Sequence, residues 1–181
     1  MSAYETVLNN VFTRIEAVRS KVNEHQIVKI VAVSKSVQAV DVENLYLSGQ
    51  RAFGENRVQE LAKKQLLLEP LPLEWHFIGR LQKNKINALI DLMPDLMHSC
   101  DSLELAEALN QRLATKNRSM NALLQINSAY EDTKAGVLPK DALETYINIQ
   151  KNYPHINLQG VMSIGAHTED KAVIKKSFEA T

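Results

Sequence analysis

The stretch IVKIVAVSKS, residues 27–36, sets the pattern that the rest of the chain repeats. Its apolar run, residues 27–33, is typical of a buried strand, and the polar residues that follow predict that Lys35 projects from the strand's carboxyl end. A lysine held there and partly withdrawn from water can lose its proton and condense with an aldehyde. A lone lysine just past a strand is more often a solvated loop charge, and position alone does not separate these interpretations.

The same alternation of apolar runs and helical patterns continues along the chain. Five further runs are predicted to be strands, near residues 51–53, 75–78, 96–99, 122–126 and 158–164. Before the first strand, Ser2 and Glu5 form a capping-box pattern that predicts the start of an amphipathic helix. The apolar positions of this helix are Leu8, Val11, Phe12, Ile15, Val18 and Val22. Strands that alternate with helices pair in parallel, so the sequence predicts an α/β fold with an extra N-terminal helix.

Several residues mark where the later helices begin or end. Gly49 is expected to end the helix after the first strand. Asp101, with Glu104 three residues on, is expected to begin another helix, and Pro139 suits the first turn of a third. No Pro-, Gly- or Ser-rich linker interrupts the pattern, so residues 1–181 are expected to form one domain.

Composition narrows the class of protein. The 181 residues are 45% hydrophobic, which is enough for one substantial core. Lys plus Arg equals Asp plus Glu at 21 each, so no overall basic field favours nucleic acid. The lone Cys100 cannot form an intramolecular disulfide and is interpreted as a small buried apolar residue. Neither a secretory leader nor an apolar span of about 18 residues is evident, so a cytoplasmic protein is expected.

Glycines and polar residues gather where the predicted strands end. Gly54, Gly79 and Gly165 follow strands directly, where the backbone must turn tightly or approach a ligand closely. None of them belongs to a GxGxxG or P-loop motif, which excludes the corresponding nucleotide fingerprints. The polar residues at this edge are Lys35, Glu55, Asn56, His76, Arg80, Ser99, Asp101, Asn127 and Ser163. An amine, carboxylates, amides and hydroxyls around one rim suit a polar aromatic aldehyde.

Several of these residues also have a purely structural interpretation. His76 alternates with Trp75 and Phe77, so it is equally compatible with a satisfied core histidine. Asn56 can cap the helix that follows, and Glu55 can pair with a neighbouring cation.

The sequence gives less support for a basic binding patch or a metal site. Arg57, Arg80, Lys83 and Lys85 are interpreted as solvated charges, with a basic patch for RNA or a phosphorylated metabolite as the less favoured alternative. The histidines are too scattered for a recognisable ligand spacing, so no metal site is predicted.

Short sequence motifs allow a more specific assignment to a protein family. The segments VAVSK (31–35), FGENRVQE (53–60) and WHFIGRLQKNK (75–85) closely resemble the pyridoxal phosphate homeostasis protein family. The later motifs that are similar, in the same order and spacing, are LQIN (124–127), KAG (134–136) and LQGVMSI (158–164). The resemblance therefore covers essentially the whole chain.

The resemblance implies a TIM-type (β/α) barrel similar to the N-terminal domain of alanine racemase. It implies that Lys35 holds pyridoxal 5′-phosphate (PLP) as a Schiff base and that Asn56, His76 and Ser163 line the pocket. It also implies a non-catalytic carrier in intracellular PLP homeostasis, monomeric when intact, with PLP-dependent apoenzymes as recipients and no nucleic-acid or membrane partner. A PLP-dependent racemase-like enzyme is the alternative, but no convincing acid/base partner for the ring is found.

The chain departs from the family pattern in its later part. Ser163 lies in Met-Ser-Ile-Gly (162–165), where many relatives have Met-x-Ile-Pro, and Lys-Ala-Gly (134–136) replaces the commoner Lys-Ser-Gly. The chain also ends in the helix after the sixth predicted strand, whereas a complete barrel takes about 250 residues and frequently builds its phosphate site after strands seven and eight. We therefore expect about six of eight β/α units, as in a fragment or a disrupted gene product, with weak PLP retention and two open sheet edges.

Overall fold

The computed structural model describes residues 2–23, 25–131 and 134–181. Its six strands form one parallel sheet in chain order. They are β1 (Val31–Val33), β2 (Ala52–Glu55), β3 (Glu74–Phe77), β4 (Leu96–Cys100), β5 (Met120–Ile126) and β6 (Ile156–Ser163). Each strand pairs with the next along the chain, which is the arrangement of a TIM-type barrel wall and confirms the predicted fold class. Among the described residues the sheet is not closed, and β1 and β6 are its two ends.

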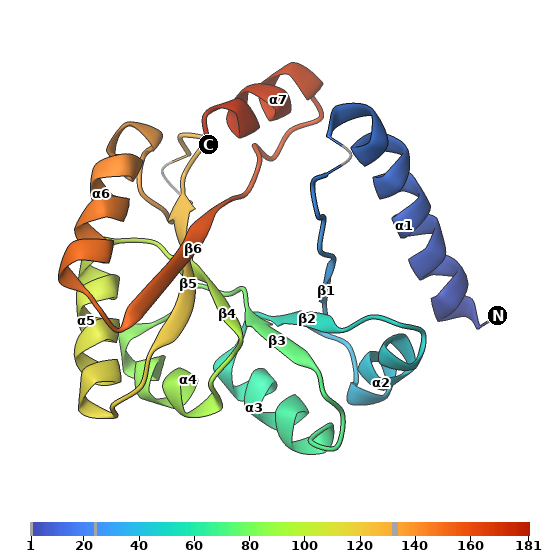
Figure 1. Cartoon of the computed structure of the whole chain (residues 1–181), viewed down its shortest axis with the longest axis horizontal. Helices are drawn as coiled ribbons and strands as arrows, with labels where there is room; N and C mark the ends of the chain where they lie inside the picture. The colour runs from blue at the N-terminus through green and yellow to red at the C-terminus, as the bar shows by residue number, and fades with distance from the viewer. Residues whose placement is uncertain (1, 24, 132–133) are drawn as a thin grey trace.

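Helices connect the strands and cover the outer face of the sheet (Figure 1). Those that connect strands are α2 (Ala39–Leu47), α3 (Val58–Leu67), α4 (Ile86–Leu92), α5 (Leu103–Thr115) and α6 (Pro139–Asn152), whereas α1 (Ala3–Val22) precedes β1 and α7 (Lys171–Glu179) follows β6. A short 3-10 helix, η1 (Lys83–Lys85), precedes α4. Figure 1 shows α1 and α7 on the open side of the wall, next to the ends formed by β1 and β6.

Three predicted helix boundaries are confirmed. Ser2 Oγ accepts from the Glu5 N–H at 3.1 Å and the Ser2 N–H donates to Glu5 Oε2 at 3.2 Å, which completes the capping box of α1. Gly49 lies just beyond α2 with φ +112°, a left-handed conformation that favours glycine after a helix end. Pro139 is the first residue of α6, where its missing N–H leaves no helical hydrogen bond unmade.

Two boundary predictions are wrong. Ser102, rather than Asp101, is the N-cap of α5, because the Ser102 hydroxyl reaches the Leu105 N–H at 3.2 Å. The first strand spans Val31–Val33 instead of residues 27–33, since β2, its partner among the described residues, begins opposite Val31. The other strands overlap their predictions with ends shifted by at most two residues, and Gly54 consequently lies inside β2.

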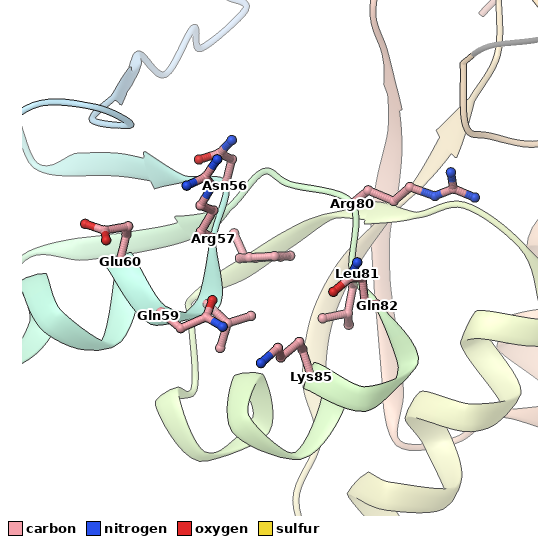
Figure 2. Close-up of a pocket in the computed structure, with 10 residues that line it drawn as sticks. Asn56, Arg57, Gln59, Glu60, Arg80, Leu81, Gln82 and Lys85 are labelled. Carbon is pink, nitrogen blue, oxygen red and sulfur yellow. The ribbon is translucent and has the colours of Figure 1, made fainter.

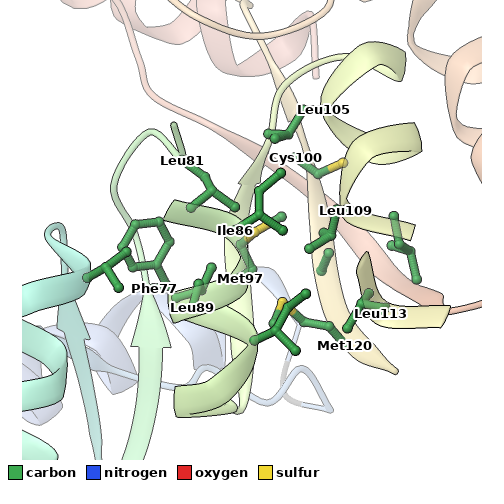
Figure 3. Close-up of a cluster of buried hydrophobic side chains, with 14 of the residues drawn as sticks. Phe77, Leu81, Ile86, Leu89, Met97, Cys100, Leu105, Leu109, Leu113 and Met120 are labelled. Atoms are coloured by element: carbon green, nitrogen blue, oxygen red, sulfur yellow. The ribbon is translucent and has the colours of Figure 1, made fainter. Parts of the chain in front are cut away.

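The core lies between the sheet and its outer helices. Side chains alternate along each strand, so Phe53, Trp75 and Phe77 face the helices while the intervening Gly54 and His76 face the concave side. Figure 3 shows α4 and α5 supplying aliphatic side chains over β3 and β4. The buried members of these elements include Phe77, Ile86, Leu89, Met97, Leu105, Leu109 and Leu113. The concave side of the sheet is therefore free to carry polar groups.

Cys100 belongs to this core, as its sequence context predicted. It is fully buried at the end of β4, and burial raises the pKa of its thiol to about 12. The thiol is therefore protonated at neutral pH and closed to solvent, which removes it as a candidate nucleophile.

Candidate functional site

The carboxyl ends of β1 and β2 bring two of the predicted site residues to neighbouring positions. The Ser34 N–H donates to the Gly54 carbonyl at 2.9 Å, so the chain beyond β1 runs beside the end of β2. Lys35 follows Ser34, Asn56 follows β2, and both side chains are exposed. The partial withdrawal from water that would favour a neutral amine is not seen at Lys35 in this structure. Within the described ranges neither side chain makes a hydrogen bond or ion pair, which leaves a free amine beside a free amide.

Asn56 also does not cap α3. The N-cap of that helix is Arg57, and no side chain accepts from the first turn there. The capping alternative for Asn56 is therefore wrong, and its amide remains available at the rim.

A tight turn presents Lys35. The Val37 N–H donates to the Ser34 carbonyl at 3.2 Å, which closes a turn with Lys35 and Ser36 at its centre. Ser36 has φ +67°, in the left-handed region that a residue with a Cβ rarely occupies. Such a conformation persists only where the surrounding structure holds it.

Gly79 allows the loops after β2 and β3 to touch. A Cβ placed on Gly79 would lie 2.0 Å from the Asn56 carbonyl oxygen and 2.6 Å from the Asn56 carbonyl carbon. The Gly79 carbonyl in turn accepts from the Ser99 hydroxyl at 2.5 Å. The close approach at this glycine is thus to another backbone segment, the Asn56 loop, and the predicted approach to a ligand stays a prediction.

A buried ion pair lies under the Lys35 turn. Glu55, at the end of β2, is fully buried, and its Oε1 lies 2.5 Å from Nζ of Lys64 on α3. The predicted alternative that Glu55 pairs with a neighbouring cation is confirmed. Sequence reasoning missed Lys64, although a signal was present. Lys64 lies on the same helix face as Val58 and Leu61, and thus occupies a core position of the α3 stripe.

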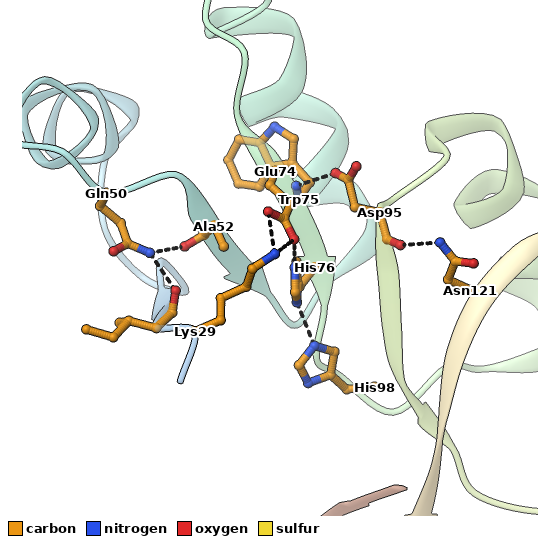
Figure 4. Close-up of polar contacts among 10 residues, drawn as sticks. Lys29, Gln50, Ala52, Glu74, Trp75, His76, Asp95, His98 and Asn121 are labelled. Atoms are coloured by element: carbon orange, nitrogen blue, oxygen red, sulfur yellow. Dashed lines mark hydrogen bonds and ion pairs between the residues drawn. The ribbon is translucent and has the colours of Figure 1, made fainter. Parts of the chain in front are cut away.

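His76 takes part in a polar chain on the concave side of the sheet (Figure 4). Its Nε2 lies 2.8 Å from Glu74 Oε1, its Nδ1 lies 2.7 Å from Nε2 of His98, and Lys29 pairs with Glu74 at 2.6 Å. Hydrogen bonds from Lys29 and then from His76 lower the pKa of Glu74. A carboxylate only accepts, so His76 directs its Nε2 proton at Glu74. Both ring nitrogens of His76 are therefore engaged, as expected of a satisfied buried histidine.

His98 is expected to make the fold sensitive to acid. Burial, and then the neighbouring His76, lower the pKa of His98 from 6.5 to about 4. Since the unfolded chain binds this proton more readily, the stability that His98 contributes is complete above pH 6.5 and is lost as the pH falls toward 4. The loss should be about 1–2 kcal/mol, less than the full shift implies because the ring is partly exposed. Urea denaturation across this pH range would measure it.

A His98→Gln variant provides the control for this pH dependence, because glutamine hydrogen-bonds without titrating in that range. The variant should lose measurably less stability than the wild type between these two pH values. An identical pH dependence in both proteins would contradict the assignment.

Ser163 lies at the other end of the sheet from Lys35. It ends β6, and its hydroxyl accepts from Thr181 Oγ1 at 3.0 Å, next to α7. The structure thus brings Lys35 and Asn56 together, places His76 deeper on the same wall, and leaves Ser163 distant along the strand order. The pocket roles of His76 and Ser163 stay predictions.

Asn127, another rim candidate, has a local role. Its amide donates to the Glu131 carbonyl at 2.8 Å and to the Lys134 carbonyl at 3.3 Å. Lys134 also donates to the Gly165 carbonyl at 3.0 Å, linking the segment after β5 to the end of β6. These contacts order the rim.

A cavity of about 540 Å³ opens between the β2–α3 loop and the β3–α4 segment (Figure 2). Phe77 and Leu81 contribute apolar surface to it, and Gln59 and Lys85 extend toward it in the view of Figure 2, whereas Arg80 extends away. Its lining residues are Asn56, Arg57, Val58, Gln59, Glu60, Phe77, Arg80, Leu81, Gln82 and Lys85.

The four cations of the suggested basic patch do not form one surface of free charges. Arg80 lies 3.4 Å from Asp101, and Lys83 pairs with Glu104. In the parts of the chain that the structure describes, no three metal-ligating side chains gather, and no helix is long and apolar enough to cross a membrane.

Comparison with known proteins places this geometry in a family. The model of the alanine racemase N-terminal domain matches residues 7–181. A pyridoxal phosphate homeostasis protein of Helicobacter pylori is 50% identical over 181 residues, which are all of this chain and 82% of the relative. The protein of the same name from Haemophilus influenzae is 37% identical over 174 residues, covering 94% of this chain and 73% of its own.

Solved structures show the same fold. A structure described as an unknown protein from Bifidobacterium adolescentis superposes with a TM-score of 0.89 at 29% identity, over 98% of this chain and 75% of its own. PipY of Synechococcus elongatus with PLP bound superposes with a TM-score of 0.71 at 31% identity, over 93% of this chain and 80% of its own. Alanine racemase of Clostridium difficile has a TM-score of 0.71 at 19% identity, a likeness that concerns the fold alone.

Proposed function

Because this chain belongs to the pyridoxal phosphate homeostasis protein family, we propose that it binds PLP in PLP homeostasis and holds it covalently through Lys35. The observation that carries the proposal is the free amine of Lys35, exposed on a tight turn at the carboxyl edge of the sheet. In α/β barrels this edge carries the site. PipY, a structural relative with PLP bound, supports the same cofactor here.

The residues at this edge fit the chemistry of PLP. PLP supplies an aldehyde that a neutral amine can attack, together with polar ring substituents and a phosphate. Lys35 offers the amine, and Asn56, just after the neighbouring strand β2, offers donors and an acceptor that no described residue uses. We propose Lys35 and Asn56 as the first two contacts. His76 and Ser163 complete the proposed set on the strength of the sequence resemblance.

We propose that the protein carries PLP without turning over a substrate. Catalysis on amino acids needs a group that moves protons at the substrate. His76, the buried histidine on this wall, has both ring nitrogens engaged with Glu74 and His98. The homeostasis names of the relatives support a carrier, with PLP-dependent apoenzymes as the proposed recipients. A racemase-like enzyme is the competing proposal, and an amino-acid racemisation assay with added PLP separates the two.

The test of PLP binding is titration of the purified chain with PLP, followed by borohydride reduction and peptide mass mapping. We expect one reduced adduct, on the peptide that contains Lys35. Lys35→Ala should remove that adduct and weaken PLP binding by about tenfold or more, because the covalent contribution is lost.

Lys29→Ala is the matched control, since Lys29 lies before β1, whereas Lys35 follows it, and pairs with Glu74. It should leave the adduct on Lys35 unchanged. Stoichiometric labelling of a different lysine in the wild-type chain, with Lys35 unmodified, would overturn the assignment of Lys35.

A further inference from the structure

Lys64 reaches from α3 to the base of the Lys35 turn. Its side chain is 4% exposed, and its Nζ lies 2.6 Å from the Ser34 carbonyl oxygen as well as 2.5 Å from Glu55 Oε1. The Ser34 hydroxyl donates to the same Glu55 oxygen at 2.8 Å. The carbonyl and the hydroxyl of Ser34, the residue before Lys35, are thus both hydrogen-bonded to one buried ion pair.

The Ser34 carbonyl is also the oxygen that closes the turn. It accepts from the Val37 N–H and from the Lys64 ammonium, so the charge-assisted bond fixes the acceptor around which Lys35 and Ser36 fold. The left-handed φ of Ser36 means that this turn needs external support. Lys64 supplies that support from beneath.

The ion pair is poorly explained as a staple for stability alone. Glu55 Oε2 is buried and has no hydrogen-bond partner within the described residues, so part of the acceptor capacity of the carboxylate is wasted. Buried ion pairs can often be replaced by apolar side chains of similar volume without loss of stability. An apolar pair would hold α3 against β2, but it could not donate to the Ser34 carbonyl.

We infer that Lys64 and Glu55 are positioning residues for Lys35, fixing the turn from which its reactive amine projects. The inference rests on the proposed function of Lys35. Because the Lys35 side chain has no partner of its own among the described residues, its backbone is the restraint that aims it. Lys64 donates to that backbone, and Glu55 holds both the Lys64 ammonium and the Ser34 hydroxyl.

The test compares two variants with the wild type. Lys64→Met breaks the pair, whereas Glu55→Met combined with Lys64→Met removes both buried charges and retains side-chain volume. We expect both to form the Lys35 adduct with PLP about tenfold to a hundredfold more slowly, as misplaced reacting groups do. Lys63→Met is the control, because Lys63 is the exposed neighbour on the same helix, and it should react at the wild-type rate.

A second readout needs no PLP. The Val37 amide, which closes the turn, should exchange with deuterium faster in both variants than in the wild type, while core amides of β4 and β5 remain protected in the double variant. If the Lys64–Glu55 pair only stabilises the fold, a different result is expected. Lys64→Met would then be less stable than the wild type, but the folded double variant would form the adduct and exchange the Val37 amide at wild-type rates.

Each outcome decides the inference. Wild-type adduct rates and Val37 exchange in a folded double variant would overturn the positioning role while the proposed function stands. A wild-type chain that never labels Lys35 would overturn both. If neither variant folds, the wild type still decides, because a Val37 amide that exchanges as fast as in a free peptide would show that the turn is not held.

Discussion

Replacing Gly79 with alanine is expected to lower the free energy of unfolding by about 3–5 kcal/mol, the range of the most disruptive single substitutions. The added methyl would lie 2.0 Å from the Asn56 carbonyl oxygen and 2.8 Å from the Asn56 Cα. Both are backbone atoms, so no side-chain rotation relieves the overlap. The loops after β2 and β3 must separate. Urea denaturation of the two proteins at neutral pH measures the loss.

Gly54→Ala is the matched control for this substitution. Its added methyl would meet the Ile78 side chain at 3.1 Å, and a side chain can shift where backbone cannot. We expect a cost of about 1 kcal/mol. A Gly79→Ala variant no less stable than Gly54→Ala would contradict the close approach. If it stays folded, displacement of the Asn56 loop should also weaken PLP binding, since Asn56 is a proposed contact.

The sequence predicted the wall of the fold because its signals are local. Apolar runs separated by helical stripes specify parallel β/α units, and the predicted strands appear in order. The length of a strand, by contrast, depends on the neighbouring strand with which it pairs. Residues 27–30 have the composition of a strand, yet β2 offers no partner until Ala52, so Ile27 is left 93% exposed.

The apolar stripe of α1 illustrates a second limit. The capping box and periodicity predicted the helix correctly, but of its apolar residues only Leu8 is buried. Val11, Val18 and Val22 remain exposed. Periodicity identifies the face of a helix that can be buried, whereas burial itself depends on which segment packs against that face.

At the site, the sequence predicted where the side chains lie but not which residues they contact. The strand pattern placed Lys35 and Asn56 at one edge, and the structure keeps them there with free side chains. The contact of His76 with His98 depends on the pairing of β3 with β4, which alternation within one strand does not specify. Lys64 was missed because a lysine on an apolar stripe is normally interpreted as a solvated charge that reaches past the core.

Lys64→Met is expected to lower the free energy of unfolding by about 3–5 kcal/mol, because it leaves the buried Glu55 carboxylate without its cation. Glu55 is fully buried and its Oε2 already lacks a partner within the described residues, so in the variant only the neutral Ser34 hydroxyl, and no described cation, would still bond to the carboxylate. Lys63→Met changes an exposed neighbour and should stay within about 0.5 kcal/mol of the wild type. Urea denaturation of these variants is the measurement.

The double variant Glu55→Met, Lys64→Met distinguishes the cost of the unpaired buried charge from the cost of altered packing. If the loss in Lys64→Met comes from the orphaned carboxylate, removing that carboxylate should restore most of the stability. A double variant as unstable as Lys64→Met would mean that packing at α3, rather than the buried charge, sets the cost. Restored stability combined with slow labelling of Lys35 is the result expected of a pair that aims the amine, because the fold then holds while the Ser34 carbonyl has lost its donor.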